Sequence, residues 1–387
     1  RDTEDRLYFT MKKVEGEIMG KPWEQDIFTV TGYSLLDGLA LPNRALIVVN
    51  MKSFDERKDP SLSVFSALAE VTKSFASIAQ ANIFVFNLPP IQGLGTGSGF
   101  EYQLDSRAGA KPEELANVAR GMMVAAHGDP NLQGVFTTYS ASTPQIYLNI
   151  DRERAQTLGL SITDVFTTLQ TAMGGSYIND FNKFGRTWQV NLQADGPDRM
   201  RIDDIFRLRV KSSQGDLIPL QAFTTVKVIT AATSIQRYNN LRSVTIQGGP
   251  SPGHSTGQAI AAMEQLSKST LPQGFSYEWT GTALQEKQAA GQTASILGLS
   301  LLFAYLFLVA LYESWSIPVS VLVSVVVGVS GGMLALLIAG LDNNIYAQIG
   351  IVVLIALAAK NAILIVEYAM DQRRQGEDIV HSAVSGA

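Results

Sequence analysis

Cysteine is absent from the 387-residue chain, and so are most residue groupings that carry enzyme chemistry. Without cysteine there is neither a disulfide framework nor a thiolate nucleophile. The three histidines are scattered without the spacing of metal ligands, and no G-x-x-x-x-G-K-[ST] phosphate loop occurs. We therefore predict no metal site, no cofactor and no covalent catalysis, and we do not expect an enzyme.

Excess positive charge is also missing. The chain has 30 Lys and Arg against 35 Asp and Glu, a formal net charge of −5, and no basic run. Nucleic-acid surfaces are basic because they neutralise phosphates, so this balance argues against a nucleic-acid partner.

Charge is nearly absent from one long region. Between Lys287 and Lys360 the only charged residues are Glu313 and Asp342. An uncharged helix of 25 residues is roughly 37 Å long, enough to cross a hydrocarbon core of about 30 Å. A buried bundle in a soluble protein is the alternative. We predict three membrane helices followed by a cytoplasmic amphipathic segment, at 287–313, 317–341, 345–371 and 372–387 respectively.

The flanking charges orient these helices. Arg373 and Arg374 follow the third span, whereas Lys287 alone precedes the first. Because basic residues favour the cytoplasmic side, residues 1–286 are predicted to lie outside the cytoplasm. The chain is then a multi-pass protein of a lipid bilayer.

The polar part begins with an α+β pattern. Helical spacing over 3–19 precedes strand patterns at 23–33 and 45–52, separated by a loop over 32–44. Asp59 and Pro60 then open a helix that continues to about Ala79, and a strand is predicted at 82–88. This αββαβ order is the split βαβ motif without its first strand. We infer a subdomain over 1–97 and a chain that is a piece of a longer protein.

A second α+β subdomain is interrupted by an insertion. Its predicted parts, 98–141 and 233–286, each read as βαβ. The insertion, 142–232, contains a helix with a capping box at Ser161 and Asp164 and a hairpin with arms at 176–181 and 186–192. Such a projecting arm is typical of contact with a neighbouring molecule, and an ordinary solvent loop is the alternative.

The glycine-rich segment 93–99, "GLGTGSG", superficially matches a dinucleotide fingerprint. It leads into a strand rather than a helix, so no helix N-terminus is available for a phosphate. We predict a hinge between two subdomains instead.

Lys360 is the unusual residue of the third span. A charge within a membrane costs at least about 2.5–3.5 kcal/mol. No acid of the chain lies at the depth of Lys360: Glu313 and Asp342 are at helix ends, and Glu367 lies seven residues away, about 10 Å along the helix. We therefore expect that Lys360 pairs with an acid in residues absent here. The alternative is that the lysine is merely tolerated at this position and has no function. A buried lysine paired with a titratable acid can serve as a proton relay, because a proton on the acid weakens the pair and frees the lysine to move.

Five segments of the chain are distinctive: "LYESWSIP" (311–318), "AAKNAILIVEYA" (358–369), "SGFEYQLDSRAG" (98–109), "RYNNLRSVTIQGG" (237–249) and "GGSYINDFNKFGR" (174–186). Together they resemble the C-terminal half of a resistance–nodulation–division multidrug efflux pump of the hydrophobe/amphiphile type. The resemblance implies a bacterial inner-membrane protein with α+β porter subdomains in the periplasm, an inserted docking subdomain and an all-α membrane part. It also implies a homotrimer that passes amphiphilic compounds to a periplasmic adaptor protein and an outer-membrane channel, driven by protons.

The resemblance assigns roles to individual residues. Lys360, with Asn361 beside it, matches the proton relay, whose two aspartates lie in the missing half. Docking between protomers falls on Phe181, Phe184 and Trp188. Substrate-binding positions are matched by Phe28, Tyr33, Leu35, Phe84, Phe86, Leu88 and Phe136.

This sequence departs from the family in the switch loop, where "GYSL" at 32–35 replaces Gly-Phe-Gly-Phe, and at Gly93, where some relatives have an acid. The substrate spectrum therefore cannot be transferred. Two other functions remain open: a membrane-anchored assembly or translocation factor without a drug pocket, and a metal-exporting relative.

Overall fold

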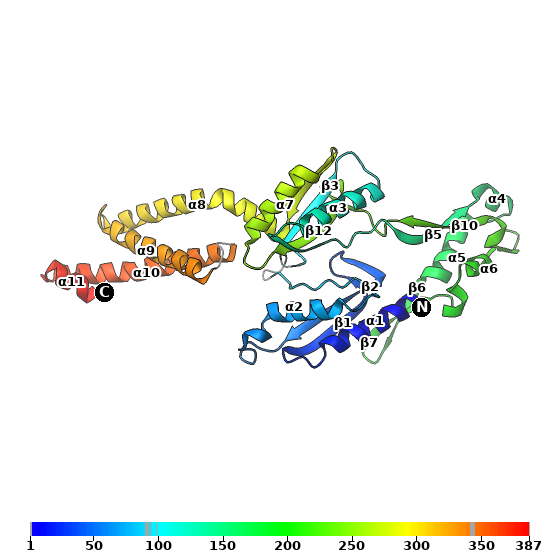
Figure 1. The fold of residues 1–387 in the computed structure, drawn as a ribbon, viewed down its shortest axis with the longest axis horizontal. Helices are drawn as coiled ribbons and strands as arrows, with labels where there is room; N and C mark the ends of the chain where they lie inside the picture. The colour runs from blue at the N-terminus through cyan, green and yellow to red at the C-terminus, as the bar shows by residue number, and fades with distance from the viewer. Residues whose placement is uncertain (1, 90–92, 94, 98, 341–344, 387) are drawn as a thin grey trace. The chain divides into compact units, whose positions relative to one another are not determined.

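The computed structural model describes residues 2–89, 93, 95–97, 99–340 and 345–386, without the side chains of 2–5, 290–297, 300 and 345 (Figure 1). The chain divides into two compact units, each formed by two segments. The first unit comprises 1–86 and 138–235, and the second comprises 87–137 and 236–387.

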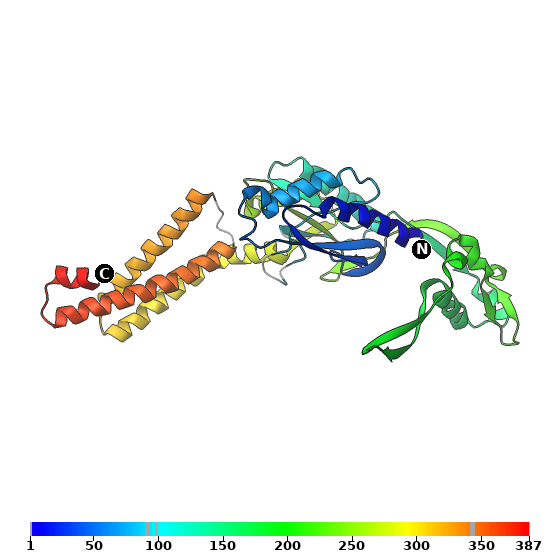
Figure 2. The same ribbon diagram turned by 90° about the horizontal axis from the view of Figure 1, so that it is seen from below.

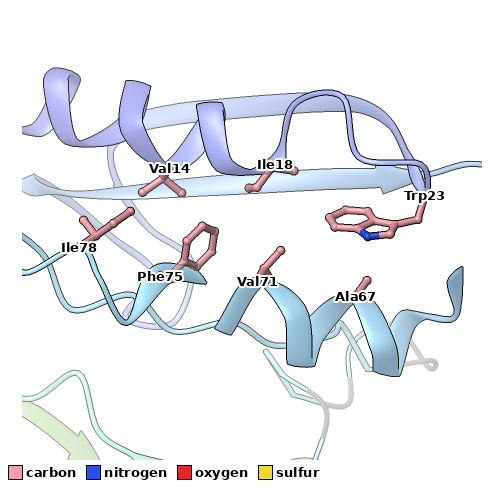
Figure 3. Close-up of a cluster of buried hydrophobic side chains, with 7 residues drawn as sticks. All are labelled: Val14, Ile18, Trp23, Ala67, Val71, Phe75 and Ile78. Carbon is pink, nitrogen blue, oxygen red and sulfur yellow. The ribbon is translucent and has the colours of Figure 1, made fainter. Parts of the chain in front are cut away.

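The first unit opens with a two-stranded sheet covered by two helices. Helix α1 (Asp2–Ile18) precedes the antiparallel pair β1 (Glu24–Ser34) and β2 (Leu39–Met51), and α2 (Val64–Phe75) follows. Apolar residues of α1 and α2 face each other, with Trp23 at one end of the cluster and Ile78 at the other (Figure 3). Ile27, Ile47, Val49 and Met51 of the strands pack against the same cluster. The helix-facing side of the hairpin is therefore its core side.

The predicted loop over 32–44 is wrong, because most of it is strand. Tyr33 pairs with Ala40 and Ser34 with Leu39, so only residues 35–38 form the turn. The turn is closed by Ser34 Oγ, which donates to Asp37 Oδ2 at 2.5 Å, and Gly38 takes the left-handed conformation (φ 65°) that favours glycine. Asp37 Oδ1 also accepts from Thr138 Oγ1 at 2.6 Å, which fixes the tip of the hairpin.

Two further predictions for this region need correction. Residues 82–88 are not a strand: β1 and β2 pair with each other, and neither provides a hydrogen-bonded neighbour for this segment. Its Ile83 and Val85 still pack on the core, which explains the apolar pattern. The helix predicted from Asp59 to Ala79 is divided, because Asp59 caps only a short 3-10 turn, Pro60–Leu62, and Ser63 caps α2.

The insertion has its own core. Strand β5 (Thr143–Ile150) pairs with β10 (Thr224–Ala231), and helices α4 (Arg152–Thr157), α5 (Ile162–Leu169) and α6 (Ile202–Arg207) lie between them in sequence. Val165, Leu220 and Phe223 are buried together with residues of the small pair β8 (Arg209–Lys211) and β9 (Leu217–Pro219). Ser161 begins α5, but its side chain accepts no capping hydrogen bond, so the predicted capping box is wrong.

The second unit contains a five-stranded antiparallel sheet. Its order is β11 (Gln236–Tyr238), β12 (Leu241–Pro250), β3 (Phe100–Ser106) and β13 (Phe275–Thr280), with β4 (Leu132–Phe136) also paired to β12. Helices α3 (Pro112–His127) and α7 (Thr256–Thr270) cover one face (Figure 1). The two predicted β-α-β sequences are confirmed as elements, β3-α3-β4 and β12-α7-β13.

The faces of this sheet differ sharply in polarity. Tyr102 and Leu104 alternate with Gln103 and Asp105 along β3, and the apolar pair is completely buried with Met122 of α3. On the polar face, Asp105 pairs across the strands with Ser243 and Ser276. Asp105 is fully buried, and within the described part of the chain neither carboxyl oxygen has a hydrogen-bond partner. Burial, with a smaller contribution from Glu278, raises the pKa of Asp105 to about 7.

We expect Asp105→Asn to remove a pH dependence of stability. A carboxyl whose pKa is raised on folding stabilises the folded state only when protonated, so its contribution is lost as the pH rises from about 4 to about 7. At pH 8 the Asn variant should therefore be more stable than the wild type, by up to about 4 kcal/mol, and at pH 4 the two should be similar. Thermal unfolding of the purified protein at both pH values measures this; an equal difference at the two pH values would contradict it.

The C-terminal part is helical. Helices α8 (Gly281–Tyr312), α9 (Ile317–Ala339) and α10 (Ile345–Arg374) are followed by α11 (Ile379–Gly386), which folds back along α10 (Figure 2). By length and composition α9 and most of α10 are apolar enough to span a membrane, and the described apolar part of α8 is Leu301–Tyr312. The end of the second predicted span, residue 341, and the connection at 342–344 lie outside the described residues.

Small residues bring α9 and α10 together. Gly328 and Gly332 lie one turn apart on α9. A Cβ added to Gly328 would lie 3.3 Å from Ala358 of α10, and one added to Gly332 would lie 3.0 Å from Leu354. In a membrane, where lipid is as apolar as leucine, such close backbone approach is a main source of helix association. This packing fixes which face of α10 points toward α9.

Candidate functional site

Lys360 lies on the face of α10 that points away from α9. Ala358 contacts Gly328, and Ala362, one turn later, is buried against Leu308 of α8 and Val321 of α9. Residue 360 is two positions from Ala358 and two from Ala362. Two positions correspond to a rotation of about 200° around a helix, so the Lys360 side chain projects from the side of α10 opposite these alanines. Lys360 and Asn361 are both exposed.

No acid of the described part forms an ion pair with Lys360. Glu367 lies about two turns further along the same helix, beyond the reach of a lysine side chain of roughly 6 Å. An exposed lysine in the middle of an apolar helix requires a polar neighbour, because its charge is poorly tolerated by hydrocarbon. The free face of α10 at residues 360 and 361 is therefore a surface that another polar group can occupy.

The predicted substrate-binding residues are distributed over both units. Phe28 and Tyr33 lie on β1, Leu35 in the turn, and Phe84 and Phe86 in the extended segment of the first unit. Leu88 and Phe136 belong to the second unit.

Within the first unit, the predicted substrate-binding residues differ in how far they are exposed. Ile27 packs on the core and Phe28, its neighbour, projects to the other face of the hairpin with 61% of its surface exposed. Phe84 alternates with Ile83 and Val85, which contact the core, and is only partly exposed. Phe28 is thus available for binding without disturbing the α1–α2 core.

The hairpin of the insertion projects without a core of its own. Strands β6 (Ser176–Lys183) and β7 (Arg186–Leu192) pair with each other, as the sequence predicts, and all but one of their residues are exposed. Phe181 lies opposite Trp188, whose Nε1 donates to the Lys183 carbonyl at 3.0 Å. Phe184 occupies the turn with 83% of its surface exposed.

The sequence did not indicate how the glycine-rich segment is attached. Part of the predicted hinge, residues 94 and 98, lies outside the described residues. In the described part, Glu101 Oε1 accepts from the Thr96 backbone at 2.7 Å and from its hydroxyl at 2.9 Å, and Gln247 Nε2 donates to that hydroxyl at 3.0 Å. The alternation of polar residues on β3 was the only available signal for this contact.

Comparison with known proteins identifies the family. A sequence profile described as the AcrB/AcrD/AcrF family matches residues 3–387. The multidrug export protein AcrF of Escherichia coli (strain K12) is 37% identical over 362 residues, which is 93% of this chain and 35% of AcrF.

Two other relatives give the same picture. The multidrug/solvent efflux pump membrane transporter MepB of Pseudomonas putida is 35% identical over 92% of this chain and 34% of its own length. The multidrug resistance protein MdtF of E. coli (strain K12) is 35% identical over 94% of this chain and 35% of its own. The chain therefore spans about a third of the length of these relatives. The resemblance to the resistance–nodulation–division transporters is confirmed, and the chain belongs to the AcrB/AcrD/AcrF family.

Proposed function

We propose that this chain is part of an inner-membrane transporter that exports amphiphilic drugs and other hydrophobic compounds in exchange for protons. The family supports drug export, since the relatives carry names of multidrug and solvent efflux pumps. The observation that carries the proton part is Lys360, a lysine inside an apolar helix on a face that the described helices leave open. In this proposal two carboxylates from the remainder of the protein face Lys360 and Asn361.

The remaining elements of the proposal concern architecture. The 1–97 and 98–141 plus 233–286 segments form porter subdomains in the periplasm, 142–232 docks protomers in a homotrimer, and three helices cross the inner membrane. A periplasmic adaptor and an outer-membrane channel receive the substrate. The exposed face of β1 around Phe28 supports a substrate surface on the first subdomain.

Export by the full-length transporter in cells lacking their own pumps tests this function. We expect lower accumulation of an amphiphilic dye than in cells without the transporter, and loss of the difference when a protonophore collapses the gradient. Phe28→Ala should change the export of some amphiphiles more than others, whereas Phe65→Ala, on α2 with a side chain even more exposed than that of Phe28 (79% against 61%), should not. A translocation factor without a drug pocket would leave accumulation unchanged at every step.

The docking hairpin leads to a prediction about assembly. An isolated two-stranded hairpin is marginal in water, so its exposed aromatic residues require a contact surface. We expect a cysteine at Phe184 to form cross-links between protomers of the intact transporter. Phe54→Cys is the matched control, because Phe54 is as exposed as Phe184 (84% against 83%) but lies in the loop after β2. Only intramolecular products at position 184, in an otherwise cysteine-free protein, would contradict the docking role.

A further inference from the structure

Helix α8 begins where the sheet of the second unit ends. Strand β13 ends at Thr280 and α8 starts at Gly281, so no linker separates them. Thr282 Oγ1 donates to the Gly99 carbonyl at 2.9 Å, and Ala283 is completely buried. The first turn of the helix is therefore packed onto the soluble unit from which it emerges.

A single carboxyl oxygen extends this attachment by a further turn. Glu264 of α7 accepts at Oε1 from Trp279 Nε1 of β13 at 2.9 Å, and the same oxygen accepts from Lys287 Nζ of α8. The indole of Trp279 is held in turn by edge-to-face contacts with Phe100 and Tyr102 of β3. We call Glu264, Trp279 and Lys287 the clamp.

The charges of the clamp fit its geometry. Burial by itself would raise the pKa of Glu264, but the hydrogen bonds from Lys287 and Trp279 outweigh it, and the resulting pKa lies below the ordinary value. The positive charge of Lys268, one turn further along α7, acts in the same direction without a hydrogen bond to Glu264. The carboxylate is thus charged at neutral pH, when it binds Lys287 most strongly.

We propose that the clamp makes the start of the first membrane helix move as one body with the sheet of the second unit, so that Glu264 and Lys287 are positioning residues for transport. A helix transmits a displacement only if its end cannot pivot. Thr282 and Ala283 hold one turn, and Lys287 lies one turn after Ala283, which suppresses pivoting. The consequence for transport rests on the proposed function, whereas the attachment of the helix does not.

Hydrogen exchange in the full-length transporter tests the attachment directly. Lys287→Met and Glu264→Gln should each accelerate exchange of the amides over 281–289 by about 3- to 10-fold, because a partly exposed charged hydrogen bond is lost. The double variant should be no faster than either single one, since both remove the same contact. Lys287→Arg should stay close to wild type. Lys268→Met, which removes an equal charge near Glu264 but no hydrogen bond, is the matched control.

Export of an amphiphilic dye by the same variants tests the consequence. We expect Lys287→Met and Glu264→Gln to slow export several-fold at matched protein level, and Lys287→Arg and Lys268→Met to export normally. Unchanged exchange over 281–289, or an equal effect of Lys268→Met, would overturn the clamp. Faster exchange with undiminished export would show an attachment without a positioning role. If the wild type itself exports nothing, the proposed function fails, and exchange alone decides whether the clamp holds the helix.

Discussion

Replacing Lys360 by methionine should abolish export while leaving the protein folded, assembled and able to bind substrate. The charge of Lys360 costs at least about 2.5–3.5 kcal/mol in the membrane, so its removal should not destabilise the helix itself. What is lost is the partner of the proposed carboxylates. Two facing acids without a lysine repel each other, which raises one of their pKa values and holds a proton that the transport cycle must release.

Uptake by vesicles with an imposed pH gradient measures this prediction on matched amounts of protein. Substrate binding by Lys360→Met should be unchanged, whereas export should fall to the level of vesicles without transporter. Ser324→Ala is a suitable control. It removes a hydroxyl of α9 that, among the residues the structure describes, donates only within its own helix, to the Ser320 carbonyl. If Lys360→Met still pumps at the wild-type rate, the lysine is a tolerated residue of the membrane part and not a member of the proton path.

A methyl group at Gly99 should prevent the second unit from folding normally. The residue has φ 109°, a left-handed conformation that side chains disfavour, and a Cβ would lie 2.2 Å from the carbonyl oxygen of Gly248. That oxygen belongs to strand β12, and Phe100, the residue next to Gly99, pairs with Gly248 in the sheet, so neither backbone can retreat freely. Backbone strain and overpacking each cost about 1–3 kcal/mol, and together we expect a loss of about 3–5 kcal/mol.

Thermal unfolding and the yield of full-length protein test the Gly99→Ala variant. Gly121→Ala is the matched control: Gly121 lies within α3 with no atom within 4 Å of an added Cβ. The control should be neutral or more stable by about 0.5–1 kcal/mol, because alanine favours helix. Equal midpoints for the two variants would mean that the backbone at Gly99 adapts more easily than its contacts indicate.

Local signals in the sequence predicted many elements correctly. Helix α3 follows from Pro112 at its start, and the arms of the β6–β7 hairpin follow from residue alternation around a polar turn. The predicted strand at 82–88 failed for a physical reason. Its apolar residues do contact the core, but a strand also needs a hydrogen-bonding neighbour, which residue pattern alone does not supply. The loop over 32–44 failed because a turn at Asp37 and Gly38 lets the flanking residues pair.

The sequence by itself determined that apolar helices follow a mixed α+β part, and that Lys360 lies within one of those helices, because both follow from composition and from spacing along the chain. Only the tertiary structure decided which way residues face. The contact of Gly328 with Ala358 turns Lys360 away from α9, and the core beneath β1 turns Phe28 outward. Contacts between distant segments were equally hidden, as when Glu264 meets Lys287 of α8. Such contacts depend on how elements pack in three dimensions, and no local pattern encodes that packing.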